Sequence, residues 1–201
     1  MILLLAVAAG LLAGLARAGI KKKPYREPEL SWLWLVILAV APQLLAFHIS
    51  ATAGWFSDRW ASAILVASQL ALLGFVWVNR RLTGMKILGL GLVLNLLVIS
   101  LNNGLMPLTP QTAGALFPEL PASTWVTGLR PGRSKNIILP LSETRLAFLS
   151  DTILLPAWFP WTRALSAGDL LIALGIFWLL AVEAPLDPVP DQAGNEPSHQ
   201  S

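Results

Sequence analysis

The stretch from Ile87 to Pro118 carries no charged residue, yet Asn102-Asn103-Gly104 interrupts it near its middle. A polar triplet that ends in glycine stops a helix at the point where a membrane segment would finish. Because lipid offers no hydrogen-bond partner to a free backbone group, such a break must be buried in protein, reach the interface or line a wet cavity. The search for a functional site therefore starts at this break.

The composition indicates an integral membrane protein. Of the 201 residues, 55% are hydrophobic and 12% are charged, whereas soluble proteins carry about 25% charged residues. The formal net charge of +3 comes from clusters beside apolar runs, with no basic face interleaved with aromatic residues. We therefore expect no binding to nucleic acid. The absence of cysteine excludes disulfides and cysteine-ligated metals.

The apolar pattern predicts an all-α membrane protein with five transmembrane helices, since a span needs roughly 20 mostly apolar residues. The expected spans cover residues 1–20, 30–49, 60–79, 86–101 and 166–182, within one domain that ends at residue 182. Residues 102–165, called the cap segment below, contain short apolar runs interrupted by proline. They are expected to form an extracytoplasmic cap or a re-entrant loop between the fourth and fifth helices. The proline-rich, acidic tail 183–201 is expected to be disordered.

Basic residues predict the orientation of these spans. The first and third connections together carry seven lysine and arginine residues, including Lys86, and the second carries Arg59 alone. The positive-inside rule then places the N-terminus outside and the acidic tail in the cytoplasm. The first span is expected to be retained, because its lysines follow the apolar run, whereas a signal peptide carries its charge before it. The predicted location is the plasma membrane, crossed five times.

Small residues recur at every fourth position of the first span, at Ala6, Gly10, Gly14 and Ala18. This spacing lets two helix backbones approach closely in lipid. The stripe agrees with packing inside the bundle, and it also agrees with another membrane subunit that docks through the Ala6, Gly10 and Gly14 face. The other predicted partner is the lipid bilayer itself.

Polar residues near the break form a candidate site. Asn95 lies seven residues before Asn102, about two helical turns, so both side chains face the same way. Asn103 and Gly104 complete the break itself. The topology then brings the cap segment, with Arg145 and Asp151, to the same side. We expect Arg145 to neutralise the aspartates while the asparagine amides bind a headgroup, an ion or a partner segment.

Asp169, near the start of the fifth span, has two interpretations. Ser166 three residues before it is typical of a capping box, in which both side chains satisfy the free backbone groups of a helix start. Alternatively, Asp169 turns into the bundle and pairs with Arg145 or Arg163, because ionisable groups at membrane depth are usually paired.

No motif in the chain indicates catalysis. The segment from Thr127 to Lys135 resembles a phosphate loop only superficially and is expected to be an exposed turn, because the required spacing is missing. A serine-hydrolase elbow is absent, and His48 is the only histidine before the tail, which excludes bis-histidine metal or haem sites. Asp151 and Asp169 could be read as the catalytic pair of an intramembrane aspartyl protease, but the glycine-x-glycine-aspartate pattern of those enzymes is absent. We therefore predict no catalytic residue, no metal and no cofactor.

Three motifs resemble a bacterial membrane-protein family known only as domain of unknown function 5317. They are Asn102 to Pro107, then Thr144-Arg145-Leu146 with Leu149-Ser150-Asp151, and finally Leu165 to Asp169. The family usually has glycine where this chain has Asn103 and Ser150. The resemblance implies a multi-pass bacterial membrane protein and implies no activity.

Three functions remain open from the sequence. The leading hypothesis is a non-enzymatic protein, either a small membrane subunit or a binding module with a polar site on its outer face. The first alternative is a membrane enzyme or small transporter that acts on a lipid-like substrate, which requires a cavity reaching Asn95 and a perturbed pKa at Asp151 or Asp169. The second is a purely structural or assembly protein, in which the same motifs are caps and turns.

Overall fold

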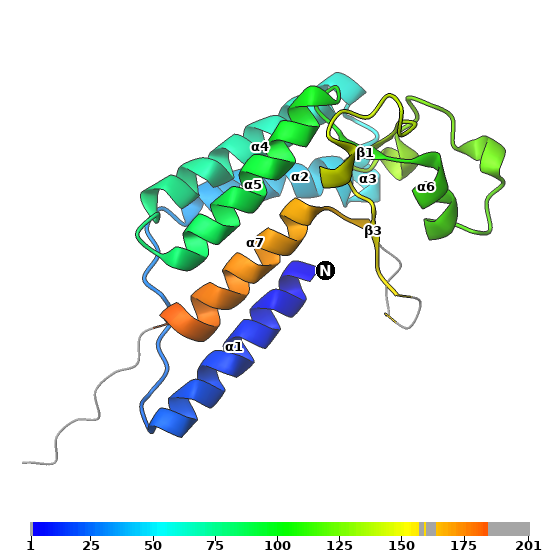
Figure 1. The fold of residues 1–201 in the computed structure, drawn as a ribbon. Helices are drawn as coiled ribbons and strands as arrows, with labels where there is room; N and C mark the ends of the chain where they lie inside the picture. The colour runs from blue at the N-terminus through cyan, green and yellow to red at the C-terminus, as the bar shows by residue number, and fades with distance from the viewer. Residues whose placement is uncertain (1, 157–158, 160–163, 185–201) are drawn as a thin grey trace, which may run out of the picture.

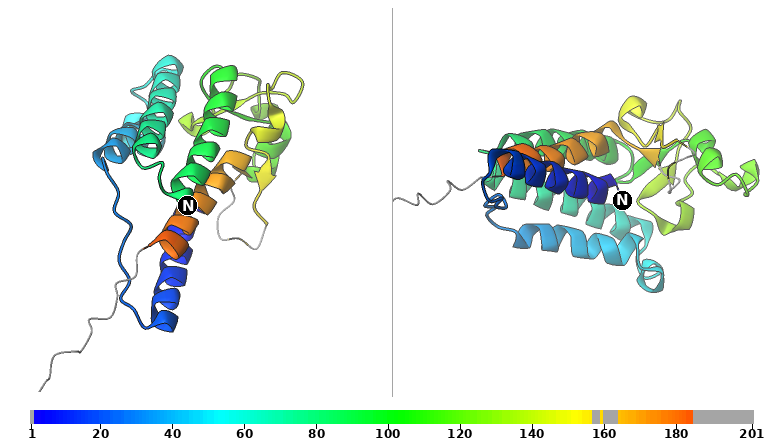
Figure 2. Two further views of the ribbon diagram at one scale, coloured as in Figure 1. Left: turned by 60° about the vertical axis from the view of Figure 1, so that its left-hand side comes forward. Right: turned by 90° about the horizontal axis from the view of Figure 1, so that it is seen from below.

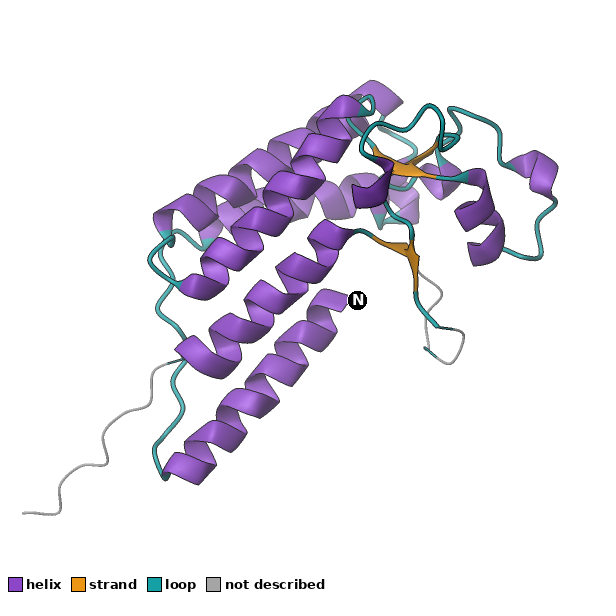
Figure 3. Cartoon of the chain, in the orientation of Figure 1, coloured by secondary structure: helices purple, strands orange, loops and turns teal. Residues whose placement is uncertain are grey.

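A computed structural model of the chain describes residues 2–156, 159 and 164–184. Long helices lie beside one another, and the cap segment gathers at one end of them (Figure 1; Figure 3). We call this the cap end, where α5 ends and α7 begins, and we call the opposite end, with Lys21 to Lys23 and Arg80, the basic end. The helices outside the cap segment are α1 (Ile2–Lys21), α2 (Trp34–Phe47), the short α3 (Ser50–Ala53), α4 (Asp58–Val78), α5 (Thr83–Leu101) and α7 (Ala167–Trp178), which continues as the π-helix η4 (Leu179–Glu183).

Each of the five segments expected from hydropathy overlaps one of these helices. Three of them, α1, α4 and α5, are long and apolar enough to cross a membrane. The other two are shorter than expected. Helix α2 has 14 residues because Trp32 adopts a left-handed conformation (φ 61°) just before it, and α7 has 12 residues before the helix widens into η4.

Glycines bring α5 and α7 into backbone contact. The two helices run antiparallel, and an added Cβ atom at Gly91 would lie 2.5 Å from the carbonyl oxygen of Gly168. Two helical turns away, Gly84 and Gly175 meet in the same way. A Cβ atom added at Gly84 would lie 2.7 Å from the carbonyl oxygen of Gly175, and one added at Gly175 would lie 2.6 Å from that of Gly84. In lipid, close backbone approach replaces the hydrophobic drive that joins helices in water. This interface fixes the start of α7 beside the end of α5.

The small-residue stripe of α1 is occupied within the chain. Ala6, Gly10, Gly14 and Ala18 are buried, and α1 packs along α7 and η4 (Figures 1 and 2). A Cβ atom added at Gly14 would lie 2.5 Å from the carbonyl oxygen of Leu180. The sequence left two uses of this stripe open, packing inside the bundle and docking of a partner subunit. In the structure, the stripe packs inside the bundle.

Polar contacts close the basic end. The carboxylate of Glu183 accepts hydrogen bonds from the backbone N–H groups of Thr83 and Gly84, so it caps the start of α5. Asn79, at the end of α4, exchanges two hydrogen bonds of 2.9 Å with the backbone of Ser31. Glu183 thus belongs to the folded part, although the sequence assigns it to the tail; residues 185–201 lie outside the described part.

The cap segment contains short elements that the sequence does not predict. Strands β1 (Met106–Leu108) and β2 (Asn136–Ile138) pair in parallel, and β3 (Ile153–Leu154) pairs with β4 (Ala164–Leu165) in antiparallel fashion. Their partners are 10 to 30 residues apart, so no local pattern marks them. The remaining elements are α6 (Pro110–Leu116) and the 3₁₀ turns η1 (Ala122–Thr124), η2 (Pro131–Arg133) and η3 (Ala147–Leu149).

One hydrophobic core joins the cap segment to the helices. Leu65 of α4 and Val98 and Ile99 of α5 pack with Met106 of β1 and Ile137 of β2. Met106 and Val98 are fully buried. A second small core, around Trp125 and Ile138, lies within the cap segment itself. The strand pair β1–β2 therefore sits directly on the ends of α4 and α5, and it positions the residues that follow.

Candidate functional site

A buried polar triad joins α5 to the start of α7. The amide of Asn95 donates to Oδ1 of Asp169 at 2.9 Å and accepts from the hydroxyl of Ser166 at 2.8 Å. Ser166 and Asp169 also form the capping box of α7. Gly168 makes room for this arrangement, because a Cβ atom there would lie 2.1 Å from Oδ1 of Asn95. Both interpretations of Asp169 therefore hold in part: it caps its own helix, and it turns toward α5.

Lys135 lies between the two aspartates. Its ammonium nitrogen is 3.2 Å from Oδ2 of Asp151 and 3.8 Å from Oδ2 of Asp169. The amide of Asn136 donates to the same oxygen of Asp151 at 2.7 Å. The Asp151 side chain is 3% exposed, that of Asp169 is 20% exposed, and that of Lys135 is 36% exposed. The cluster thus holds two carboxylates and one cation, with the cation on the solvent side.

The electrostatics single out Asp151. Burial raises the pKa of this carboxyl above its ordinary value, and Lys135 opposes the shift by favouring the charged form. The charge of Asp169 raises the pKa further, whereas the hydrogen bond from Asn136 lowers it. The second oxygen, Oδ1, is buried and has no hydrogen-bond partner among the described residues. Asp151 is the residue of the cluster whose charge is least well compensated.

Asn102 fastens the cap segment to the end of α5. Its amide nitrogen donates to the carbonyl oxygens of Val98 and Arg145, at 2.8 and 2.9 Å, and its oxygen accepts the backbone N–H of Arg145 at 2.9 Å. Asn79 forms the same pattern with Phe75 and Ser31 at the basic end. At the ends of α4 and α5, an asparagine side chain thus donates to a carbonyl oxygen of the last helical turn, and it also binds the backbone of a distant segment of the chain.

The residues after Asn102 turn the chain toward β1. Asn103 has φ 59° and Gly104 has φ 75°, both in the left-handed region. Asparagine tolerates this region better than most other residues with a side chain, which explains how a residue other than glycine is accommodated at this position. Gly104 is required sterically, because a Cβ atom there would lie 1.6 Å from the hydroxyl of Ser62. That hydroxyl donates to the carbonyl oxygen of Asn103 at 3.0 Å.

The structure brings the predicted residues together in two groups. Asn95, Asp151 and Asp169 lie in the polar cluster, and Asn102, Asn103 and Gly104 form the turn and the fastening point beside it. Arg145 does not carry out the expected neutralisation. It contributes its backbone to Asn102, while its side chain is exposed and forms no ion pair among the described residues. Arg163, the other expected partner of Asp169, lies outside the described residues.

The sequence missed Lys135 and Asn136. Both follow the glycine- and arginine-rich turn, so Lys135 was expected to be exposed with it. Lys135 is instead partly covered and paired: the N–H of Met106 donates to the carbonyl oxygen of Lys135 at 3.0 Å, which starts the β1–β2 pairing and places Lys135 over α7. The short apolar, β-branched run Ile137-Ile138-Leu139 that follows Lys135-Asn136 was the one available signal, since such a run favours a strand.

Comparison with known proteins decides the family. Residues 27–181 match the family of unknown function DUF5317. The chain belongs to this family. The match covers more than half of the 201 residues and contains every residue of the polar cluster. The resemblance seen in the sequence motifs is confirmed.

A similar protein from Thermotoga maritima is described as an uncharacterized protein. It is 27% identical to this chain over 144 residues, which cover 68% of this chain and 74% of the relative. No solved structure matches the chain.

Chemically, the cluster is suited to holding charge in place and less to coordinating a metal. Within the described residues, no group of three or more histidine, cysteine or acidic side chains lies together. The hydrogen-bonding capacity of Asn95 and Ser166 is used inside the cluster, and these residues are 3% and 0% exposed. What the arrangement does directly is tie three chain segments, at α5, α7 and the cap, with one buried network.

Proposed function

We propose that the chain is a five-pass protein of the bacterial plasma membrane with its N-terminus outside and its C-terminus in the cytoplasm. Three helices have the length and apolarity for a crossing. The helices α2 and α7 supply the other two, α2 with the apolar residues that flank it and α7 with η4 as its continuation. Among the short connections, those at the basic end carry seven basic residues and the one at the cap end carries Arg59 alone, and the positive-inside rule assigns the richer end to the cytoplasm.

Single cysteines test this topology, because the chain has none of its own. Cysteine at the exposed position Ser142, in the cap segment, is expected to react with a membrane-impermeant maleimide in intact cells. Cysteine at Lys23, at the basic end, is expected to react only after the membrane is opened. Labelling of both positions in intact cells, or of neither after opening, contradicts the proposed orientation.

We further propose that the protein is a non-enzymatic membrane subunit whose cap segment is a fixed docking platform for the extracytoplasmic part of another membrane protein. The observation that carries this proposal is the polar cluster, in which Lys135 bridges Asp151 and Asp169 while Asn95 joins α5 to α7. Such a network holds the cap in one position on the helices. Apolar side chains remain exposed on its surface, among them Leu141 at 64% and Phe148 at 74%, and a rigid apolar surface suits a protein partner.

Photo-crosslinking from the cap tests the docking function. A photoreactive residue at Leu141 is expected to give one protein adduct of defined mass in native membranes. The same residue at Leu90, an equally exposed position on α5, serves as the matched control and is expected to give lipid adducts only. Replacing Asn102 by alanine releases the cap and is expected to abolish the adduct from Leu141. If Leu141 yields only lipid adducts or copies of the chain itself, the docking function is wrong.

One observation favours the alternative of an enzyme or transporter for a lipid-like substrate. Oδ1 of Asp151 is buried without a partner, and the pKa of this carboxyl is raised, as is typical of proton-transfer groups. Replacement of Asp151 by asparagine separates the two functions. A docking platform keeps its crosslink in this variant, whereas a proton-dependent activity is lost although the protein stays folded.

A further inference from the structure

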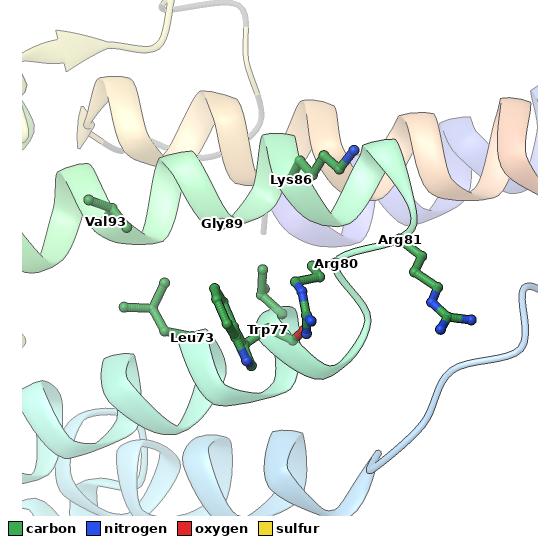
Figure 4. A pocket seen from close by; sticks show the side chains of 8 residues that line it. Leu73, Trp77, Arg80, Arg81, Lys86, Gly89 and Val93 are labelled. Atoms are coloured by element: carbon green, nitrogen blue, oxygen red, sulfur yellow. The ribbon is translucent and has the colours of Figure 1, made fainter.

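A groove at the basic end, between α4 and α5, combines apolar walls with positive charge. Its volume is about 680 Å³. Leu73 and Val93 line it on the side of the helix middles, and Trp77 lies nearer the turn that joins the helices (Figure 4). Val76 also contributes to the lining. The three basic residues of the lining, Arg80, Arg81 and Lys86, all belong to that turn and the start of α5. Charge is thus confined to one end of the groove and apolar surface to the rest.

Arg80 is held in place by Trp77. Its guanidinium lies over the indole ring, 4.4 Å from the ring centre, and one nitrogen donates to the carbonyl oxygen of Trp77 at 2.9 Å. Figure 4 shows these two side chains side by side between the helices, with Arg81 and Lys86 extending separately from the turn and from α5. Arg80 is thus held in position by Trp77, and most of its N–H groups remain available to donate hydrogen bonds to a ligand.

The positive charge at this groove is not neutralised within the protein. Among the described residues, no acidic side chain forms an ion pair with Arg80, Arg81 or Lys86. Glu183 at the same end is engaged with the backbone N–H groups of Thr83 and Gly84. A ligand that complements the groove therefore carries an anionic head and an apolar chain.

We propose that this groove binds an anionic glycerophospholipid of the inner leaflet, with its phosphate at Arg80, further positive charge from Lys86 at the same end, and an acyl chain along Leu73 and Val93. Basic pockets between helices on the cytoplasmic side are known to suit anionic headgroups. The partly exposed Trp77 lies at the depth where indole rings meet the headgroup layer. The inference rests on the proposed topology only in requiring that the basic end face the inner leaflet. It is independent of the docking function at the cap.

Native mass spectrometry of the full chain in a neutral detergent tests the proposal. The probes are phosphatidylglycerol and phosphatidylcholine with identical acyl chains. From about 1 kcal/mol per basic residue near anionic lipid, we expect phosphatidylglycerol to bind at least about ten-fold more tightly. The double variant Arg80→Gln, Lys86→Gln is expected to reduce this preference to about two-fold or less. The control Lys21→Gln, Lys23→Gln removes the same charge from the basic end outside the groove and keeps the preference.

The apolar part of the groove has its own variant. Val93→Trp fills the groove with an apolar side chain at an exposed position, and it is expected to weaken the binding of both lipids without unfolding the protein. Equal binding of the two lipids by the native chain overturns the proposal. So does an equal loss of preference in the lysine control, or full competition by millimolar inorganic phosphate, which marks a site for a soluble anion. The cysteine labelling described above fails separately if the orientation is wrong.

Discussion

Replacing Lys135 by methionine leaves the two aspartates of the polar cluster without their shared cation. Loss of one partner of a fully buried ion pair costs about 3–5 kcal/mol of unfolding free energy, and loss of an exposed pair costs about 0–1 kcal/mol. Lys135 is 36% exposed and Asp151 is 3% exposed, so this pair lies between the two cases. We expect a cost of about 1–3 kcal/mol, discounted for solvent screening at the lysine.

The cost is expected to depend on pH with a defined sign. Burial already raises the pKa of Asp151, and removal of Lys135 raises it further, because Lys135 lowers it in the native cluster. Between the ordinary aspartate pKa, about 3.9, and the raised value, the folded state binds more protons than the unfolded state. Stability therefore falls as the pH rises through the raised pKa. The difference between the variant and the native chain is smallest at acidic pH, where Asp151 is protonated in both, and it grows as the pH rises from the raised pKa of the native chain to the still higher pKa of the variant.

Thermal unfolding in detergent, followed by tryptophan fluorescence, measures this effect. The expected cost corresponds to a decrease in Tm of about 3–10 °C at neutral pH. Asp151→Asn supplies the matched background: with no charge at residue 151 and only Asp169, at 3.8 Å, left to compensate, the same lysine replacement is expected to cost clearly less there. An equal decrease in both backgrounds, or a decrease that does not change with pH, would show that Lys135 does not act by neutralising Asp151.

Two further predictions concern the backbone around the site. Asn103→Ala places a less tolerant side chain at φ 59° and is expected to lower stability by about 1 kcal/mol, whereas Asn103→Gly is expected to keep or raise the Tm; an equal Tm in both variants argues against a left-handed turn. Gly91→Ala pushes a Cβ atom against the backbone of Gly168 and is expected to cost about 1–3 kcal/mol. The control Gly74→Ala, whose Cβ atom meets only Leu35 at 3.9 Å, is expected to be neutral or slightly stabilising in the same thermal assay.

The helices could be predicted because their signal is local. Runs of apolar residues place the ends of α1, α4 and α5 within three residues of the observed ends. The end of α5 at Asn102 was visible for the same reason, since a polar triplet with glycine cannot continue an apolar helix. The stripe of small residues on α1 also marked a buried face correctly.

The glycine interface of α5 and α7 was not recognised, although its residues are equally local. Gly84 and Gly91 are seven residues apart, as are Gly168 and Gly175. Either pair alone is unremarkable in an apolar helix, where glycine is common. Only the antiparallel packing of the two helices shows that the glycines of each helix make room for the backbone at the glycines of the other.

By itself, the sequence determined the class of the protein, the positions of its long helices, the break at Asn102 and the family. These follow from hydropathy and from residue types at neighbouring positions. Only the tertiary structure decided which cation meets Asp151 and Asp169. Arg145 is nearer to Asp151 in sequence, but its backbone is bound by Asn102 and its side chain points to solvent. Lys135 reaches both carboxylates because β2 pairs with β1 about 30 residues away, and no local pattern encodes the register of such a pairing.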